Sequence, residues 1–306
     1  KGYLEPLEKN VMTEEVRDSF PQKYLESICE ENGHIYSVPF QMDIMMFWVN
    51  QELLKQAGLD EIKNTGDFDI LQKSLKNPDQ YAYGDAWENT HVYNSLSQFV
   101  NFWGGDYFDW TDPKTKDAAR YMKSMLDEKN TSPAQFVDQY EQMEEKFIRG
   151  KYGCVFMYTG ALGTFLDADV YGKNKIHMAP LPVLHKKKAT NIATWQYVLN
   201  NASENKDAAV RFLQYAAGYE GSTEYAKIMK SYPARVDVIE NEDIDLEGID
   251  MIRKYLREYT LNARPLCENS MGAVSDMGKL FQGYVLGQCE EDSFFEQAQN
   301  CINTYY

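Results

Sequence analysis

One segment, residues 32–59, constrains the fold more than any other part of the chain. It opens with an Asn-Gly turn signal and continues as a short predicted strand that ends at Pro39. Two polar residues, Gln41 and Asp43, follow, and then comes the apolar, β-prone run Ile44–Val49. A short helix that stops at a glycine completes the segment. A strand, a polar crossing and a second strand predict a hinge between two domains, with side chains facing a cleft.

Short β-prone runs alternate with longer stretches of helical spacing along the rest of the chain, which predicts an α/β architecture. Residues 60–84 are polar and carry no clear pattern. A further helix is expected to begin at Ser132-Pro133 and to end near Gly150. The predicted strands are 152–158, 176–181 and 192–199, and the other predicted helices are 51–57, 90–103, 113–126, 206–217, 222–230, 249–256, 274–286 and 293–303.

The charge balance excludes several kinds of partner. The 306 residues carry a formal net charge of −16, and their main basic run is Lys186–Lys188. Nucleic acids and anionic membrane surfaces need basic patches, so neither is an expected partner. Apolar runs stay well short of the roughly 18 residues of a membrane span. Five scattered cysteines form neither a zinc motif nor a disulfide framework, although one pair could form in an exported protein.

Recognisable catalytic and cofactor motifs are missing from the sequence. It has no G-x-S-x-G, H-E-x-x-H or G-x-G-x-x-G pattern, and we expect no catalytic residues, no cofactor and no metal. Asp243-x-Asp245 resembles the start of a calcium loop, but Lys254 occupies the position that requires a bidentate glutamate. The four histidines stand apart from one another, so each is expected to be a surface or packing residue.

Several motifs, in a constant order, resemble those of bacterial extracellular solute-binding proteins of family 1. Residues 32–59 are similar to that family's segment G-K-x-Y-G-x-P-x-x-x-D/E, followed by Y-N-K-x-L-F-x-x-A-G-L. The sequence departs from the family at Ala193-Thr194, where Gly-Gly is usual, and after Gly160, where a tryptophan often follows. The other similar segments are Gly2–Leu7, Asn101–Asp106, Asp112–Asp127, Phe147–Gly160, Met178–Pro182, Thr194–Leu213, Pro233–Arg235 and Ala263–Pro265.

The resemblance implies a two-lobed α/β fold of the periplasmic-binding-protein type II class. Lobe one would comprise residues 1–42 and 192–262, and lobe two residues 46–190 and 264–306, with crossings near 42–46, 190 and 263. Family members begin with strands and helices that precede the Gly2–Leu7 element. The first strands and helices of lobe one are therefore expected to be absent from residues 1–306, or to be supplied by a partner chain.

The resemblance also implies that a ligand binds between the lobes without being chemically changed. Asp43 and Gln41 would accept or donate hydrogen bonds to sugar hydroxyls, while Trp195 and Trp103 would stack on the sugar ring. Asp43 could instead cap a hinge, and either tryptophan could be a core residue. The remaining candidates are Tyr158 and Arg235, of which the arginine could equally form a structural ion pair.

The expected function is the substrate-binding component of an ABC importer that captures a mono- or oligosaccharide. Its partners would be the sugar and the membrane permease subunits, and the protein itself would be a monomer. It would lie at the extracellular face of a bacterial membrane, lipid-anchored, or in the periplasm, with an export signal outside the printed sequence. A secreted polysaccharide hydrolase and a surface adhesion module are the alternatives, and peptide, amino-acid or polyamine ligands stay open.

Overall fold

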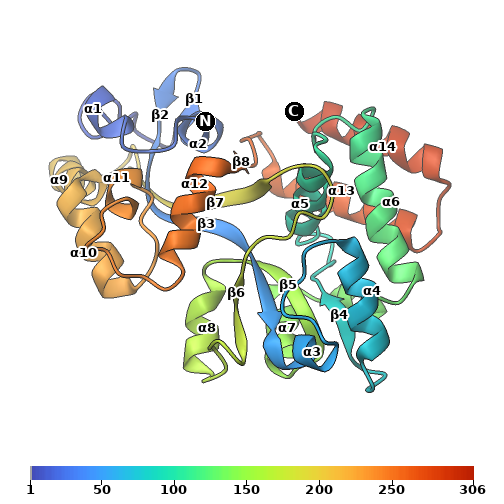
Figure 1. Cartoon of the computed structure of the whole chain (residues 1–306). Helices are drawn as coiled ribbons and strands as arrows, with labels where there is room; N and C mark the ends of the chain where they lie inside the picture. The colour runs from blue at the N-terminus through green and yellow to red at the C-terminus, as the bar shows by residue number, and fades with distance from the viewer. Residues whose placement is uncertain (1) are drawn as a thin grey trace. The chain divides into compact units, whose positions relative to one another are not determined.

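The structure, a computed structural model, describes residues 2–306, which divide into two compact units (Figure 1). The first unit extends to Ile44 and includes Ile192–Leu266, and the second comprises Met45–Asn191 and Cys267–Tyr306. These boundaries fall beside the crossings that the sequence predicts near 42–46, 190 and 263. Strands β3 (Ser37–Asn50) and β7 (Ala189–Val198) each continue from one unit into the other.

Strand β3 differs from the prediction of two strands separated by a polar crossing. It is one strand of 14 residues, and its early part pairs antiparallel with β7 from Ser37 to Ile44. Its later part pairs with β5 and with β6. The register shifts between Pro39 and Gln41, which is where proline lacks an N–H for the ladder. Proline thus produces an irregularity in the strand, while backbone pairing carries the strand through the polar residues.

The first unit packs helices around a small sheet, in which β3, β7 and β8 are neighbours. A separate hairpin, β1–β2, turns at Asn32 and Gly33, whose positive φ values of 54° and 79° fit the predicted Asn-Gly turn. Figure 1 shows α9, α10 and α11 grouped together in this unit. Its elements besides β3 and β7 are α1 (Glu14–Arg17), α2 (Gln22–Ile28), β1 (Glu30–Glu31), β2 (His34–Ile35), α9 (Lys206–Ala217), α10 (Tyr219–Met229), α11 (Val236–Ile239), α12 (Ile249–Glu258) and β8 (Thr260–Asn262).

The apolar core of the first unit lies mainly between its N-terminal segment and α9. Its buried members come from both segments of the unit, so the two segments fold as one body. The cluster contains Leu7, Val11, Met12, Phe20, Leu25, Cys29, Ile35, Val38, Leu199, Leu213, Ala217 and Ala234.

The second unit is built on a sheet in which β4 and β5 run parallel and β3 and β6 antiparallel to their neighbours. Helices α5, α6, α13 and α14 gather on one side of this unit in Figure 1. Its elements besides β3 and β7 are α3 (Gln51–Gln56), α4 (Thr65–Ser74), β4 (Tyr81–Gly84), α5 (Tyr93–Trp103), α6 (Pro113–Asp127), a 3-10 helix (Pro133–Val137), α7 (Tyr140–Ile148), β5 (Tyr152–Tyr158), α8 (Ala161–Asp167), β6 (Ile176–Ala179), α13 (Ser270–Val285) and α14 (Glu291–Tyr305).

Two stretches of the second unit differ from the sequence prediction. Residues 60–84, which carry no clear pattern, contain α4 and β4, and the N-terminus of α4 is closed by a capping box of Asn64 and Asp67. The single helix expected from Ser132-Pro133 is a 3-10 helix followed by α7, because an extended Asp138 and the Gln139 cap interrupt it.

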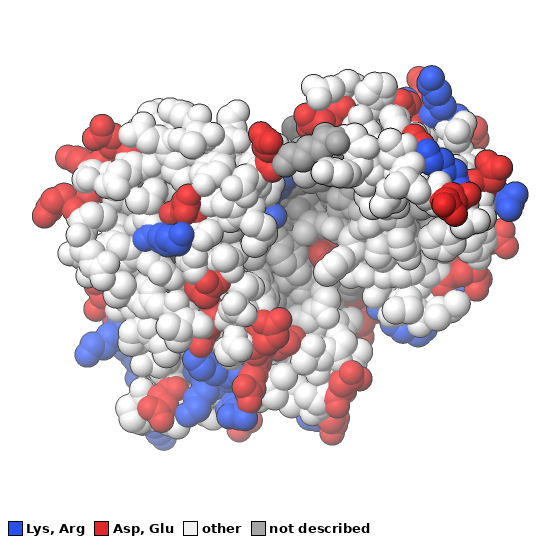
Figure 2. All heavy atoms as spheres, turned by 180° about the vertical axis from the view of Figure 1, so that it is seen from behind, with Lys and Arg blue, Asp and Glu red and all other residues white. Residues whose placement is uncertain are grey.

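The surface carries charges of both signs, and the cysteines are unpaired. On the face in Figure 2, acidic and basic side chains are interspersed. All five cysteines are free thiols, and Cys29 and Cys154 are buried. Among residues 2–306, no helix combines the length and apolarity needed to cross a bilayer.

Candidate ligand-binding site

Three of the predicted residues meet on one face of the β3–β7 ladder in the first unit. The indole Nε1–H of Trp195 donates to Asp43 Oδ2 at 3.1 Å, and Gln41 Nε2 donates to both Asp43 carboxylate oxygens at 3.2 and 3.3 Å. Gln41 pairs with Trp195 across the ladder, and Asp43 lies two residues further on the same strand face. The register of two strands therefore assembles a carboxylate, an amide and an indole ring.

Exposure divides this trio into a buried acceptor and a projecting ring. Asp43 is only 8% exposed, whereas Trp195 is 63% exposed. Large aromatic side chains are usually buried, so an exposed indole whose N–H is fixed by a buried carboxylate is unusual. The arrangement offers a ring face for apolar stacking beside a carboxylate that accepts hydrogen bonds, which is the chemistry that a sugar ring with hydroxyl groups requires.

Two further side chains of the first unit hold Gln41, and neither is among the predicted site residues. Tyr225 of α10 donates its hydroxyl to Gln41 Oε1 at 2.5 Å. Thr194 donates its hydroxyl to the backbone carbonyl of Gln41 at 2.8 Å. Tyr225 is 184 residues from Gln41 in sequence, so no local pattern could have identified it.

A groove of about 510 Å³ in the first unit is lined by α2, β7, α12 and β8. Its volume lies within the range of small-molecule sites, roughly 300–1,000 Å³. Tyr24 lines the groove, and its hydroxyl donates to the Ala193 carbonyl at 3.4 Å. Burial, followed by nearby acidic groups that include Asp43, raises the pKa of Tyr24 well above its ordinary value. This residue therefore belongs to the groove and to the surroundings of Asp43.

Arg235 has a structural environment in the first unit. It is 8% exposed, and its guanidinium donates to both carboxylate oxygens of Asp237 at 2.9 and 2.6 Å. The same group donates to the Ala217 carbonyl and the Ser19 hydroxyl, each at 2.8 Å. These bonds occupy the guanidinium within the protein and favour the structural ion pair over a clamp on ligand hydroxyls.

Trp103 of α5 is packed inside the second unit. Its side chain is 6% exposed, and its ring stacks on His185 with 4.8 Å between centroids and 3° between planes. Tyr121 lies against it with a centroid distance of 4.9 Å. A protein ring thus occupies a face that a sugar is predicted to use, and backbone N–H groups of Lys186 and Lys187, next to His185, donate to the Phe102 carbonyl.

Tyr158 lies where β5 ends in the second unit, beside the end of the parallel strand β4. Ligands of α/β proteins commonly bind outside the carboxyl ends of parallel strands. The Tyr158 hydroxyl approaches Asn94 Oδ1 at 3.5 Å, and its ring lies near that of Tyr140 with a centroid distance of 6.4 Å. Tyr158 therefore belongs to a partly exposed polar and aromatic group at this sheet edge.

A contact between a histidine and a carboxylate extends the group around Tyr158. Glu88 Oε2 lies 3.0 Å from His91 Nδ1, and the His91 ring lies 5.8 Å from that of Tyr140. Burial opposes ionisation of Glu88, but hydrogen bonds from Thr90 and His91 outweigh it and lower the pKa of this carboxyl. His91 thus pairs with a carboxylate, which the isolated position of the histidine in the sequence does not indicate.

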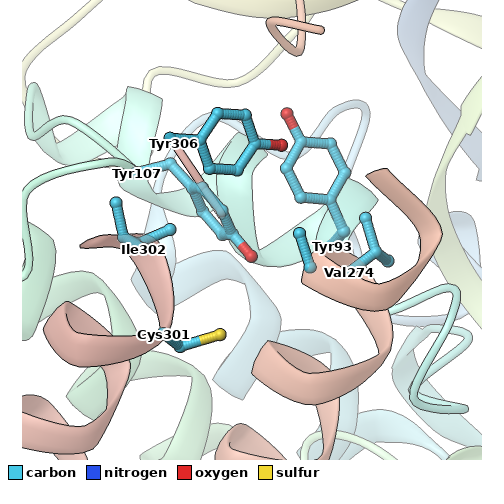
Figure 3. A pocket seen from close by; sticks show the side chains of 7 residues that line it. Tyr93, Tyr107, Val274, Cys301, Ile302 and Tyr306 are labelled. Carbon is cyan, nitrogen blue, oxygen red and sulfur yellow. The ribbon is translucent and has the colours of Figure 1, made fainter. Parts of the chain in front are cut away.

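A small pocket deeper in the second unit is too narrow for a sugar. Figure 3 shows the rings of Tyr93, Tyr107 and Tyr306 converging over it, with Val274 from α13 and Cys301 from α14 below. Its space for a water-sized sphere is about 10 Å³, which accommodates about one water molecule. In the described part of the chain, no three histidine, cysteine or acidic side chains lie close enough together to hold a metal ion.

Solved structures of similar fold include sugar-binding proteins of ABC transporters. An ABC transporter solute-binding protein of Thermotoga lettingae, bound with α-D-tagatose, matches with a TM-score of 0.85 at 17% identity, over 99% of this chain and 80% of its own. The GacH receptor of Streptomyces glaucescens, studied in complex with acarbose, matches with a TM-score of 0.82 at 18% identity, over 100% and 80%. These likenesses confirm the predicted α/β fold of two-lobed periplasmic binding proteins.

Curated relatives are similar in sequence. A probable amino-acid ABC transporter periplasmic-binding protein of Sinorhizobium fredii is 24% identical over 239 residues, which are 74% of this chain and 54% of the relative. The arabinooligosaccharide-binding protein of Bacillus subtilis is 23% identical over 248 residues, 76% of this chain and 56% of the relative. The chain spans about half the length of these relatives. A model of the bacterial extracellular solute-binding protein family matches residues 1–223, and the chain therefore belongs to that family.

Proposed function

We propose that the protein is the substrate-binding component of an ABC importer and captures a mono- or oligosaccharide. The observation that carries this proposal is the pair formed by an exposed Trp195 ring and the buried Asp43 carboxylate. Family membership supports the transport role, and the tagatose-bound, acarbose-bound and arabinooligosaccharide-binding relatives support the ligand class.

The pairing of the Asp43 carboxylate with the exposed Trp195 ring suits a sugar ligand. A sugar hydroxyl can donate a hydrogen bond to the carboxylate while the apolar ring face stacks on Trp195. Within the first unit, the neutral side chains of Gln41 and Trp195 donate to Asp43 and hold its carboxylate in place.

The proposed ligand-contacting residues are Asp43, Gln41 and Trp195 in the first unit and Tyr158 in the second. Trp103 and Arg235 stay predictions with less support, because both are occupied by contacts within their own units. Binding would involve no catalysis and no cofactor. Closure of the two lobes around the sugar would be the signal that the permease subunits recognise, and the protein would act as a monomer outside the cytoplasm, lipid-anchored or periplasmic.

A thermal-shift screen tests this function. The protein would be mixed with a panel of mono- and oligosaccharides and with matched panels of amino acids, peptides and polyamines, and each mixture would then be analysed by chromatography. We expect a rise in melting temperature with a sugar that is recovered unchanged. A shift only with an amino acid, a peptide or a polyamine would contradict the proposed ligand class. Released sugar products would indicate a hydrolase, and no shift with any compound would favour an adhesion module.

A further inference from the structure

Gln41 stands between an acceptor and a donor whose chemistry fixes the direction of its amide. Its Nε2 donates to Asp43, while its Oε1 accepts from the Tyr225 hydroxyl. A carboxylate only accepts hydrogen bonds, so the amide must present its N–H group to Asp43. The opposite orientation would place the amide oxygen against the carboxylate, which is repulsive.

The amide oxygen then points away from Asp43 and needs a donor of its own. The Tyr225 hydroxyl supplies it at 2.5 Å, the short distance of a strong O–H···O bond. Burial raises the pKa of Tyr225, so its hydroxyl keeps the proton that it donates at neutral pH. Hydrogen bonds arranged in such a series reinforce one another.

The ring of Tyr225 is itself positioned by aromatic packing. It meets Phe40 edge-on at a centroid distance of 5.4 Å, and Phe40 stacks on Tyr197 at 4.1 Å. Phe40 precedes Gln41 on β3, and Tyr197 lies on β7. The two strands that carry Asp43 and Trp195 therefore also position the ring of Tyr225. This places the Tyr225 hydroxyl beside Gln41.

We propose that Tyr225 is a positioning residue of the ligand site, which fixes the Gln41 amide with its N–H towards Asp43 and so holds the carboxylate against the Trp195 indole. The inference rests on the proposed function for its consequence in binding, but its structural part does not need a ligand. Tyr225 itself need not touch the sugar. Its loss should loosen the series Gln41–Asp43–Trp195 while leaving the fold intact.

The structural part is tested by NMR on the ligand-free protein. The indole N–H signal of Trp195 is assigned from its absence in Trp195→Phe, and the side-chain amide signals of Gln41 from their absence in Gln41→Leu. In Tyr225→Phe, we expect both sets of signals to shift and to exchange faster with solvent. Tyr215→Phe is the matched control, because Tyr215 is an exposed tyrosine of the same unit. Unchanged signals in Tyr225→Phe would overturn the proposal, whether or not a sugar binds.

The functional part is tested by a double-mutant cycle with the sugar that the screen identifies. Calorimetry should show about fivefold weaker binding for Tyr225→Phe, the range of one hydrogen bond, at an unchanged melting temperature. Because Tyr225 acts through Gln41, the double variant with Gln41→Leu should bind no more weakly than Gln41→Leu alone. Additive losses would contradict a positioning role. A wild-type protein that binds no sugar would instead contradict the proposed function, and the NMR result would still decide the role of Tyr225.

Discussion

The indole N–H of Trp195 donates to the Oδ2 atom of Asp43 across 3.1 Å, which links an exposed ring to a buried carboxylate. The hydrogen bond restricts the rotation of the ring without covering its faces. A binding surface that is held in place before the ligand arrives loses less entropy when it binds. This relationship connects the register of two strands to the proposed capture of a sugar.

Replacing Trp195 by alanine should weaken sugar binding by about tenfold or more, since stacking and the support of Asp43 are both lost. The melting temperature should change little, because most of this side chain is exposed and surface substitutions usually cost within about 0.5 kcal/mol. Calorimetry and thermal unfolding measure the two effects. Tyr3→Ala is a control that removes another exposed aromatic ring of the first unit. An equal loss of affinity in both variants would argue against a specific role for Trp195.

The variant Asp43→Asn should weaken binding by about thirtyfold, which corresponds to a lost charged hydrogen bond. The asparagine keeps the shape of the side chain. Its NH₂ group, however, faces hydrogen-bond donors where the carboxylate has an acceptor oxygen. Binding is measured by calorimetry, with Glu204→Gln as a control that removes an exposed charge from the same unit. If Asp43→Asn bound the sugar as tightly as the wild type, Asp43 would be a hinge cap and not a ligand contact.

Arg235→Met should lower the free energy of unfolding by about 2 kcal/mol, because it removes the hydrogen bonds from the guanidinium to the Ala217 carbonyl and the Ser19 hydroxyl. Urea unfolding measures this loss. Sugar affinity, measured at a temperature where the variant is folded, should stay within about twofold of the wild type. A large loss of affinity at unchanged stability would support the hydroxyl clamp that the sequence also allows.

Asp85, at the end of β4, should make stability depend on pH. Burial raises its pKa to about 6, even though the Tyr83 hydroxyl and the Trp87 indole each donate to it at 2.7 Å. In the unfolded chain its pKa is about 3.9, so the folded protein binds more protons between these values. The free energy of unfolding contributed by this group should therefore fall by about 3 kcal/mol as pH rises from about 4 to 6.

The comparison of wild type with Asp85→Asn isolates that contribution. Urea unfolding at pH 4, 5, 6 and 7 should show that the stability of the wild type relative to the variant decreases up to pH 6 and then levels off. Equal pH dependence in the two proteins would contradict the raised pKa. If the variant does not fold, a carboxyl ¹³C NMR titration of the wild type gives the pKa of Asp85 directly.

The elements that the sequence predicts best are those with a local pattern. The apolar run 152–158 and the helix 206–217 match β5 and α9 in their bounds, because strand and helix periodicity is contained in neighbouring residues. The sequence predicts two pieces in place of strand β3, because polar residues interrupt its apolar pattern. Its continuity depends on pairing with β7, some 150 residues away, which no local pattern contains.

The site could be predicted only in part for the same reason. Asp43, Gln41 and Trp195 are predicted because their motifs resemble those of a family, whereas Tyr225 has no such motif and reaches Gln41 only through the fold. Trp103 and Trp195 look alike in sequence, since both are aromatic residues in polar or glycine-rich surroundings. Burial distinguishes them, because Trp103 is stacked against His185 and is 6% exposed, whereas Trp195 is 63% exposed. The expectation that strands of lobe one lie outside residues 1–306 stays a prediction.

The most direct test of the account is a calorimetric titration of the wild type and Trp195→Ala with the sugar that most stabilises the protein in the thermal-shift screen. The account predicts saturable binding of one sugar per chain, weakened by about tenfold or more in the variant at an unchanged melting temperature. Equal affinity of the two proteins, or no binding of any sugar by the wild type, would contradict it.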